Sequence, residues 1–154
     1  FEDVEWGNLD FLILDLPPGT GDIQLTLVQK LALTGAIMVT TPQKLAVMDV
    51  KKGADMFKKV NTPLLGVIEN MTDFTCPHCD KNTKIYPGEG GAEESARLGV
   101  PLLGELPLHP NITQSTDSGI PYVIKHKESS ITEKYNQIAL QIYKIINTST
   151  QDIT

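Results

Sequence analysis

The stretch FLILDLPPGTGD, residues 11–22, decides which α/β arrangement this sequence predicts. Its glycines suggest a phosphate-binding loop, but such a loop ends in Gly-Lys-Ser/Thr, and Asp22 stands where the lysine is needed. A carboxylate at that position would repel phosphate oxygens. A carboxylate that ends an apolar strand can instead hold Mg²⁺, directly or through a water. We therefore interpret Phe11 to Leu14 as a strand and Asp15 as a magnesium ligand that faces a phosphate site.

The loop after Asp15 has a plainer alternative. Pro17, Pro18, Gly19 and Gly21 are ordinary turn formers, so the segment could be a strand-to-helix turn without chemistry. Asp15 favours the metal site, because an unpaired charge at the end of a buried strand would be costly and a cation would neutralise it.

Length and charge narrow the class of protein. With 154 residues, 40% of them hydrophobic, the chain fits one compact domain with a substantial core. The formal net charge is -6 and Arg97 is the sole arginine, which argues against a groove for nucleic-acid phosphates. No apolar run approaches the ~20 residues of a membrane span, and the first residues lack the pattern of a secretory signal. We expect a protein of the cytoplasm, or of an organelle matrix in a eukaryote. Because the sequence does not begin with Met, we also expect it to be an internal piece of a longer chain.

Short apolar runs alternate with amphipathic segments along the chain. The runs at 11–14, 36–40, 64–68 and 102–106 have the composition of strands buried on both faces of a parallel sheet. Helical patterns fill the gaps: a first around Ile23 to Leu31, a second around Val47 to Phe57, and a shorter one over 92–98 that ends at Gly99.

A last helix is predicted by its start signal and its apolar stripe. Ser130 and Glu133 form a capping-box pattern, and the stripe runs from Ile131 to Ile145. We therefore predict a three-layer α/β domain over residues 1–147, with a mostly parallel sheet flanked by helices, and a disordered tail at 148–154.

The only two cysteines, Cys76 and Cys79, form one C-x-x-C after the third predicted strand. In parallel sheets ligands bind at the carboxyl ends of the strands. The spacing lets both thiolates reach one metal, but it supplies only half of a four-coordinate shell. His78 would point away from such a metal, and His109 and His126 are isolated and expected in solvent. A second copy of the chain would complete the shell, around one zinc ion or one iron–sulfur cluster on a twofold axis.

Two other interpretations of the C-x-x-C remain open. In a thioredoxin-like site the motif opens a helix that lowers the thiol pKa, whereas a loop-like sequence follows Cys79 here. The two residues could also be unliganded thiols. The nearby glycine-rich PGEGGAEES, residues 87–95, lacks the phosphate-binding Lys, and we interpret it as a loop followed by a helix N-terminus.

The order of six motifs resembles the Mrp/ApbC family, the iron–sulfur cluster carrier P-loop ATPases related to MinD and ParA. The motifs are FLILDLPPGTGD, VTTPQKLAVMDV, GVIENMTDFTCPHC, GEGGAEE, LGELPLHPNI and DSGIPYVI. The resemblance runs from Trp6 to about Ile124. It implies a partial P-loop NTPase fold and a homodimer that transfers a [4Fe–4S] cluster to apoproteins, with ATP binding and hydrolysis as the switch. Apo iron–sulfur proteins and cluster scaffolds are the partners it implies.

The resemblance also assigns roles to individual residues. It implies that Asp15 is the Walker B acid assisting Mg²⁺ and that Asn70 reads the adenine edge. It implies a switch facing the γ-phosphate at Pro17, Gly19, Thr20 and Gly21, and a loop flanking the base at Leu106, Pro107 and Leu108. Cys76 and Cys79 would hold the [4Fe–4S] cluster between two subunits, with zinc in aerobic preparations.

The sequence departs from the family pattern in one large respect. Family members carry a Gly-rich Walker A loop upstream of the Walker B strand, and nothing in this sequence supplies it. We expect this chain alone to bind ATP poorly and not to hydrolyse it, although its parent should do both. The missing strand would lie beside the Walker B strand. Either the gap closes between the strands at 11–14 and 36–40, or a neighbour supplies a strand.

Two rival functions are compatible with parts of the pattern. A MinD/ParA-like positioning ATPase would need a basic face or tail for membrane or DNA, and the last helix offers only Lys134 and Lys144. A zinc-bridged structural dimer would use the cysteines without transferring anything.

Overall fold

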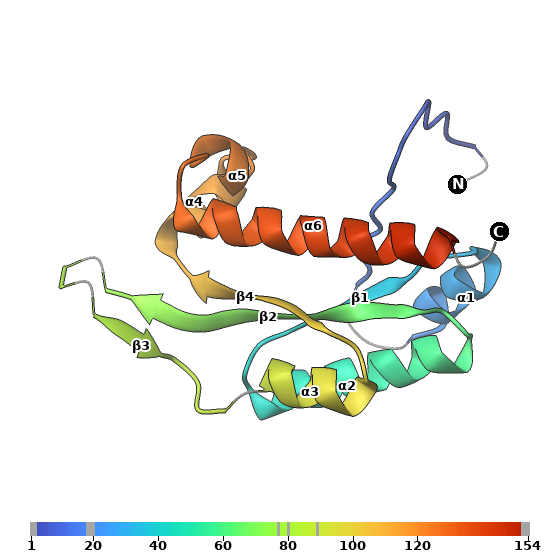
Figure 1. Ribbon diagram of the computed structural model, residues 1–154, viewed down its shortest axis with the longest axis horizontal. Helices are drawn as coiled ribbons and strands as arrows, with labels where there is room; N and C mark the ends of the chain where they lie inside the picture. The colour runs from blue at the N-terminus through green and yellow to red at the C-terminus, as the bar shows by residue number, and fades with distance from the viewer. Residues whose placement is uncertain (1–2, 18–20, 77, 80, 89, 152–154) are drawn as a thin grey trace.

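Helices cover both faces of a small mixed sheet in the computed structural model (Figure 1). The structure describes residues 3–17, 21–76, 78–79, 81–88 and 90–151. The strands are β1 (Ala36–Thr40), β2 (Leu64–Thr75), β3 (Asn82–Lys84) and β4 (Leu102–Leu108). The helices are α1 (Asp22–Lys30), α2 (Lys44–Lys59), α3 (Gly90–Leu98), α4 (Pro110–Asp117), α5 (Tyr122–Lys125) and α6 (Ser130–Gln151). The α/β class with a mostly parallel sheet is thereby confirmed.

The central strand of the sheet is β2. It pairs in parallel with β1 on one side and with β4 on the other, and its last residues pair antiparallel with β3. The helices α2 and α3 lie between the parallel strands in sequence, as crossover connections require. The carboxyl ends of β1, β2 and β4 therefore meet at one edge of the sheet.

Alternation along the strands divides the core between two helical layers. On the side of α2 and α3, Met38 and Val67 pack with Ala54 and Phe57. On the side of α6, buried Leu103, Leu106 and Ile138 form a second cluster, joined by Ile37 and Ile68. Figure 1 shows α6 above the sheet and α2 and α3 below it. Ile37 and Met38, which are adjacent in β1, thus pack against opposite helical layers.

Residues 11–14, predicted to be a strand, are not one. The segment is extended but unpaired, and its side chains are largely exposed, with Ile13 at 89%. A strand forms only when its N–H and C=O groups find partners. Among the described residues β1 pairs with β2 alone, so its other edge is open and the gap between the segment and β1 does not close.

The capping residue of the last helix lies one residue before the predicted one. Ser129 Oγ accepts a hydrogen bond from Thr132 N at 3.1 Å, so the capping residue is Ser129 and the predicted pair of Ser130 and Glu133 is wrong. The helix continues to Gln151, beyond the domain end expected at residue 147.

Helices α2, α3 and α4 share one kind of C-terminal cap. Asn61, Gly99 and Gly119 follow α2, α3 and α4 with φ of 57°, 70° and 68°. The N–H of the next residue returns to the last turn in each case, as Val100 N does to Ser95 O at 3.1 Å after α3. The predicted end of α3 at Gly99 is confirmed. Gly119 is the same kind of helix-end signal after α4, and the sequence analysis did not use it.

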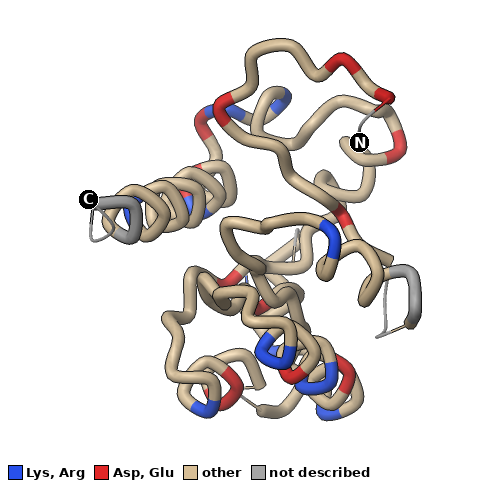
Figure 2. The backbone as a smooth tube through the Cα atoms, turned by 90° about the vertical axis from the view of Figure 1, so that its right-hand side faces the viewer, with Lys and Arg blue, Asp and Glu red and all other residues tan. Residues whose placement is uncertain are grey.

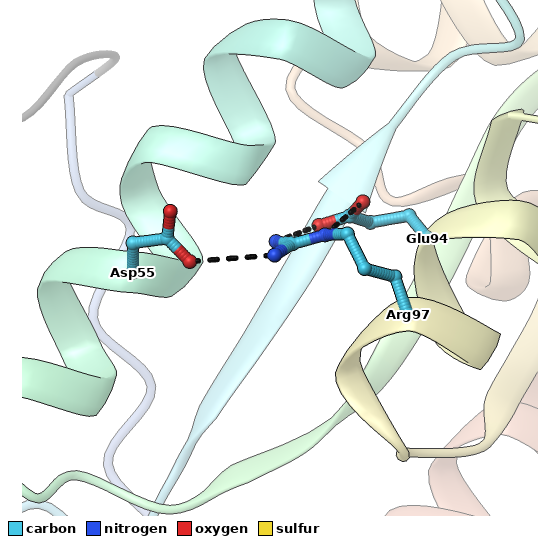
Figure 3. A network of polar contacts seen from close by, with 3 residues as sticks. All are labelled: Asp55, Glu94 and Arg97. Carbon is cyan, nitrogen blue, oxygen red and sulfur yellow. Dashed lines mark hydrogen bonds and ion pairs between the residues drawn. The ribbon is translucent and has the colours of Figure 1, made fainter.

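An ion-pair network joins α2 to α3 (Figure 3). Arg97 donates from Nε to Glu94 Oε2 at 2.9 Å and from Nη2 to Glu94 Oε1 at 2.6 Å. Glu94 is only 1% exposed, and these hydrogen bonds raise the pKa of Arg97. Asp55 on α2 lies 3.5 Å from Arg97 Nη1. The sole arginine therefore neutralises a buried carboxylate within the helical layer.

Candidate metal centre and nucleotide edge

The C-x-x-C lies at the end of a hairpin that leaves the body of the molecule. The last residues of β2 pair with β3, with Asp73 opposite Lys84 and Thr75 opposite Asn82. Cys76 N donates to Lys81 O at 3.1 Å and closes the turn. Figure 1 shows this hairpin projecting at the left of the sheet, away from the helical layers.

Both thiols are accessible, and one is prepared for deprotonation. Cys79 is exposed and Cys76 is half-buried. Hydrogen bonds from the backbone of His78, then from the backbone and thiol of Cys79, lower the pKa of Cys76 from its ordinary 9.0. The thiolate is the form that binds a metal. No helix follows Cys79, because the chain enters β3, so the thioredoxin-like arrangement is wrong.

One copy of the chain does not supply a complete metal shell in the part that the structure describes. No cluster of three or more His, Cys, Asp or Glu is found there; residues 77 and 80, beside the cysteines, lie outside it. The two remaining histidines have structural contacts. His109 and His126 flank Tyr122, with ring centroids 6.3 Å and 4.6 Å from it. Our expectation that they are solvated is wrong, since both are half-buried.

Asn70 and Leu106, which come from different strands, meet at the carboxyl edge of the sheet. They are paired in the register of β2 with β4, and the prediction of a loop at 106–108 is wrong, because these residues are the end of β4. Leu106 is buried, Pro107 is half-buried and Leu108 is 37% exposed. Asn70 Oδ1 accepts a hydrogen bond from Met71 N at 2.9 Å. The predicted base-reading residues are thus neighbours, while their role stays a prediction.

The predicted magnesium and switch residues lie on the unpaired segment. Asp15 is exposed and does not end a strand, so the argument from a buried charge does not hold in this chain. Pro17 O accepts from Gln24 Nε2 at 2.8 Å, and Gly21 is the residue before α1. Gly19 and Thr20 lie outside the described residues. The roles of all these residues stay predictions.

The sequence analysis missed a buried carboxylate at the same edge. Glu69 ends the apolar run 64–68 just as Asp15 ends 11–14, and it is 3% exposed. Its Oε1 accepts from Gly91 N, at the start of α3, at 2.6 Å. A helix N-terminus favours a negative charge, so no metal is needed to neutralise this one. At the start of α3 the backbone N–H of Gly91 binds the carboxylate of Glu69 and not a phosphate. The interpretation of residues 87–95 as a loop followed by a helix N-terminus is confirmed.

Comparison with known proteins decides the family. The family model described as ParA, NUBPL iron-transfer P-loop NTPase, matches residues 1–143. The chain belongs to this family. The NUBPL-type family includes relatives named for iron–sulfur clusters. The iron–sulfur cluster transfer protein NUBPL of Dictyostelium discoideum is 45% identical over 92% of this chain and 44% of its own length. The iron–sulfur cluster carrier protein of Escherichia coli K12 is 48% identical over 90% of this chain and 37% of its own length.

Solved structures agree with the family on the fold. The nucleotide-binding protein of Archaeoglobus fulgidus, in complex with ADP, is 34% identical with a TM-score of 0.69, over 83% of this chain and 51% of that one. The cell division ATPase MinD of Pyrococcus furiosus is 28% identical with a TM-score of 0.56, over 73% of this chain and 43% of that one. This chain thus spans less than half the length of the sequence relatives named above. No helix in the described part is long and apolar enough to cross a membrane.

Proposed function

We propose that the protein carries an iron–sulfur cluster and passes it to apoproteins, holding the cluster through Cys76 and Cys79 of two copies. The observation that supports this most is the hairpin, which places two accessible thiols away from the body of the molecule. Two thiolates from each of two copies complete the four ligands of a [4Fe–4S] cluster. The cluster is cargo, and thiols at an exposed turn suit its release.

The family's ATP switch belongs to the longer protein. Asn70 and the end of β4 at Leu106 to Leu108 would flank the base, and Asp15 and the segment at 17–21 would face Mg²⁺ and the γ-phosphate. Mg·ATP would supply the binding energy that favours one dimer arrangement over another. This chain lacks the lysine-bearing phosphate loop, so we expect the chain alone to bind ATP poorly and not to hydrolyse it.

Anaerobic reconstitution with ferrous iron and sulfide tests the proposal. We expect the visible absorbance of a [4Fe–4S] cluster, about one cluster for every two chains, and a dimeric molar mass. Cys76→Ala should abolish the cluster. His78→Ala, which removes an exposed ring from the same turn, is the matched control and should retain it. Monomeric protein that takes up zinc but no iron and sulfide would exclude a cluster carrier; a zinc dimer without cluster uptake would support the structural alternative.

A positioning ATPase of the MinD kind is less well supported by the charges. Figure 2 shows basic and acidic positions interspersed along the tube, and on α2 Lys52 lies 3.5 Å from Asp49. The helix α6 carries Lys134 beside Glu133. Neither arrangement resembles the basic face that anionic lipid or DNA would require.

A further inference from the structure

The strand β2 has a short bulge opposite β4, near the start of its pairing with β3. In the register with β4, Asn70 pairs with Leu106 and Phe74 with Leu108, so β2 advances four positions while β4 advances two. Extra residues in one strand bend it and increase its twist. Residues 71–73 therefore lie between the part of β2 that pairs with β1 and β4 and the part that forms the cysteine hairpin with β3.

The backbone at this bulge is strained. Met71 has a φ of 59°, in the left-handed region that residues with a Cβ seldom adopt. The side chain of Asn70 holds it there, because Asn70 Oδ1 accepts from Met71 N at 2.9 Å. Strained residues persist only where their surroundings hold them, and they gather at functional and switching segments. The residue that holds this strain is the same residue that would read the adenine.

Thr72 connects the two sides of the bulge. Its Oγ1 lies 3.3 Å from Leu106 O, in the part of β4 that would flank the base, and 2.8 Å from Asp73 Oδ1, in the hairpin. A hydroxyl has one hydrogen, so it donates to only one of these acceptors at a time. The Thr72 hydroxyl is therefore a two-position contact between the nucleotide edge and the hairpin.

The contacts continue from Thr72 to the cysteine turn. Asp73 Oδ2 accepts a hydrogen bond from Asn82 Nδ2, across the hairpin. Asn82 Nδ2 also lies 3.3 Å from Thr75 Oγ1, and Thr75 directly precedes Cys76. This polar relay, Thr72, Asp73, Asn82 and Thr75, links the Leu106 carbonyl to the residue beside the first thiol.

We propose that Thr72 is a positioning residue that couples the nucleotide at the Asn70 and Leu106 edge to the orientation of the cysteine hairpin. A base that displaces Leu106 shifts the Thr72 hydroxyl toward Asp73, which alters the hairpin and the release of the cluster. The inference rests on the proposed function, since it concerns how ATP acts on the same cluster site. Two observations support it. Met71 has a left-handed backbone conformation, and the Thr72 hydroxyl lies within hydrogen-bond distance of both Leu106 O and Asp73 Oδ1.

The test is the ratio of cluster-transfer rates with and without ATP in the full-length protein. Thr72→Val keeps the side-chain shape and removes the hydroxyl. We expect it to retain cluster content and ATP affinity while the ratio falls by at least ~5-fold, the lower range of known couplings. Thr72→Ser should restore the ratio. Thr83→Val, an exposed site on β3 of the same hairpin, is the control and should leave it unchanged.

A second variant keeps the inference testable if Thr72→Val is unstable. Asp73→Ala removes the oxygens that accept from the Thr72 hydroxyl and from the Asn82 amide, and it should lower the ratio. A full ratio in both Thr72→Val and Asp73→Ala overturns this inference alone. Wild-type protein that binds no cluster overturns the proposed function, and a wild-type ratio of one overturns the coupling while leaving the carrier intact.

Discussion

At the residue scale, the chemistry of the hairpin turn concentrates on Cys76. The amide groups of the turn point toward its sulfur, and they favour the charged form of the thiol. The stabilisation that these hydrogen bonds provide is present at pH above the ordinary thiol pKa, and it is lost as the pH falls through the lowered value. The hydrogen bonds of the turn thus lower the pKa of Cys76 and favour the thiolate, the form that binds a metal.

The alkylation rate of Cys76 should report this effect. We expect the rate with iodoacetamide to reach half its maximum at a pH below 9.0 in the folded apoprotein, because the thiolate is the nucleophile. Peptide mass spectrometry resolves Cys76 from Cys79. The same measurement in urea supplies the control, since unfolding removes the turn and should return the midpoint toward the ordinary value. Equal midpoints in both states would contradict the lowered pKa.

At the element scale, α3 is attached to the molecule by charge at both ends. At its N-terminus, Gly91 N donates a hydrogen bond to the carboxylate of the buried Glu69. In its last turn, Arg97 donates to the carboxylate of the buried Glu94. Gly91 is required at the first contact, because an added Cβ would lie 2.7 Å from Glu69 Cβ. The helix that follows the cysteine hairpin is therefore held by polar contacts at both ends, while the hairpin is joined to the sheet through the pairing of Phe74 with Leu108 of β4.

Removing the arginine should destabilise the fold. Arg97→Ala leaves the Glu94 carboxylate buried without a partner, and we expect the free energy of unfolding to fall by about 3 kcal/mol. Asp55→Asn is the matched control. It removes only the partly exposed contact at 3.5 Å, and should change stability by less than about 0.5 kcal/mol. Urea unfolding followed by circular dichroism measures both, and equal effects of the two variants would exclude a structural role for the Glu94 pair.

At the scale of the whole molecule, one edge of the sheet is open and apolar. Among the described residues β1 has no strand on its second side, and Val39 on it is 56% exposed. The segment at 11–16 runs unpaired, and Phe11 contacts Tyr143 of α6 with ring centroids 6.1 Å apart. Exposed strand edges invite pairing with another segment. We propose that the part of the longer protein outside this sequence supplies the strand that both β1 and residues 11–16 lack.

Hydrogen exchange distinguishes this arrangement from a permanently loose segment. In this chain alone, we expect the amides of residues 11–16 to exchange without protection, since they have no strand partner. In the full-length protein the same amides should be slowed by ~100-fold or more. The amides of β2 at 67–69, where the strand pairs with both β1 and β4, provide the internal control. Unprotected exchange at 11–16 in the full-length protein would exclude a paired strand there.

The sequence by itself determined those strands and helices that pack against other parts of this same chain. Ala36 to Thr40 was predicted with its observed bounds, because an apolar run between two helical patterns has one solution. The family resemblance implied that Asn70 and Leu106 lie beside one base, and the register of β2 with β4 makes them neighbours. The C-x-x-C predicted a metal site at the turn, and that role stays a prediction. The end of α3 was likewise readable, since Gly99 adopts a φ that other residues avoid.

Only the tertiary structure decided which apolar runs become strands and which carboxylates are neutralised. Both outcomes depend on the residues that lie opposite in space, which are distant in sequence. Phe11 to Leu14 has a strand's composition and lacks a strand's partner. Asp15 and Glu69 follow the same local pattern, yet one is in solvent and the other is bound by a helix N-terminus distant in sequence. The bulge at Met71 and the contact of Thr72 with Leu106 arise from register between strands, which periodicity along one strand does not encode.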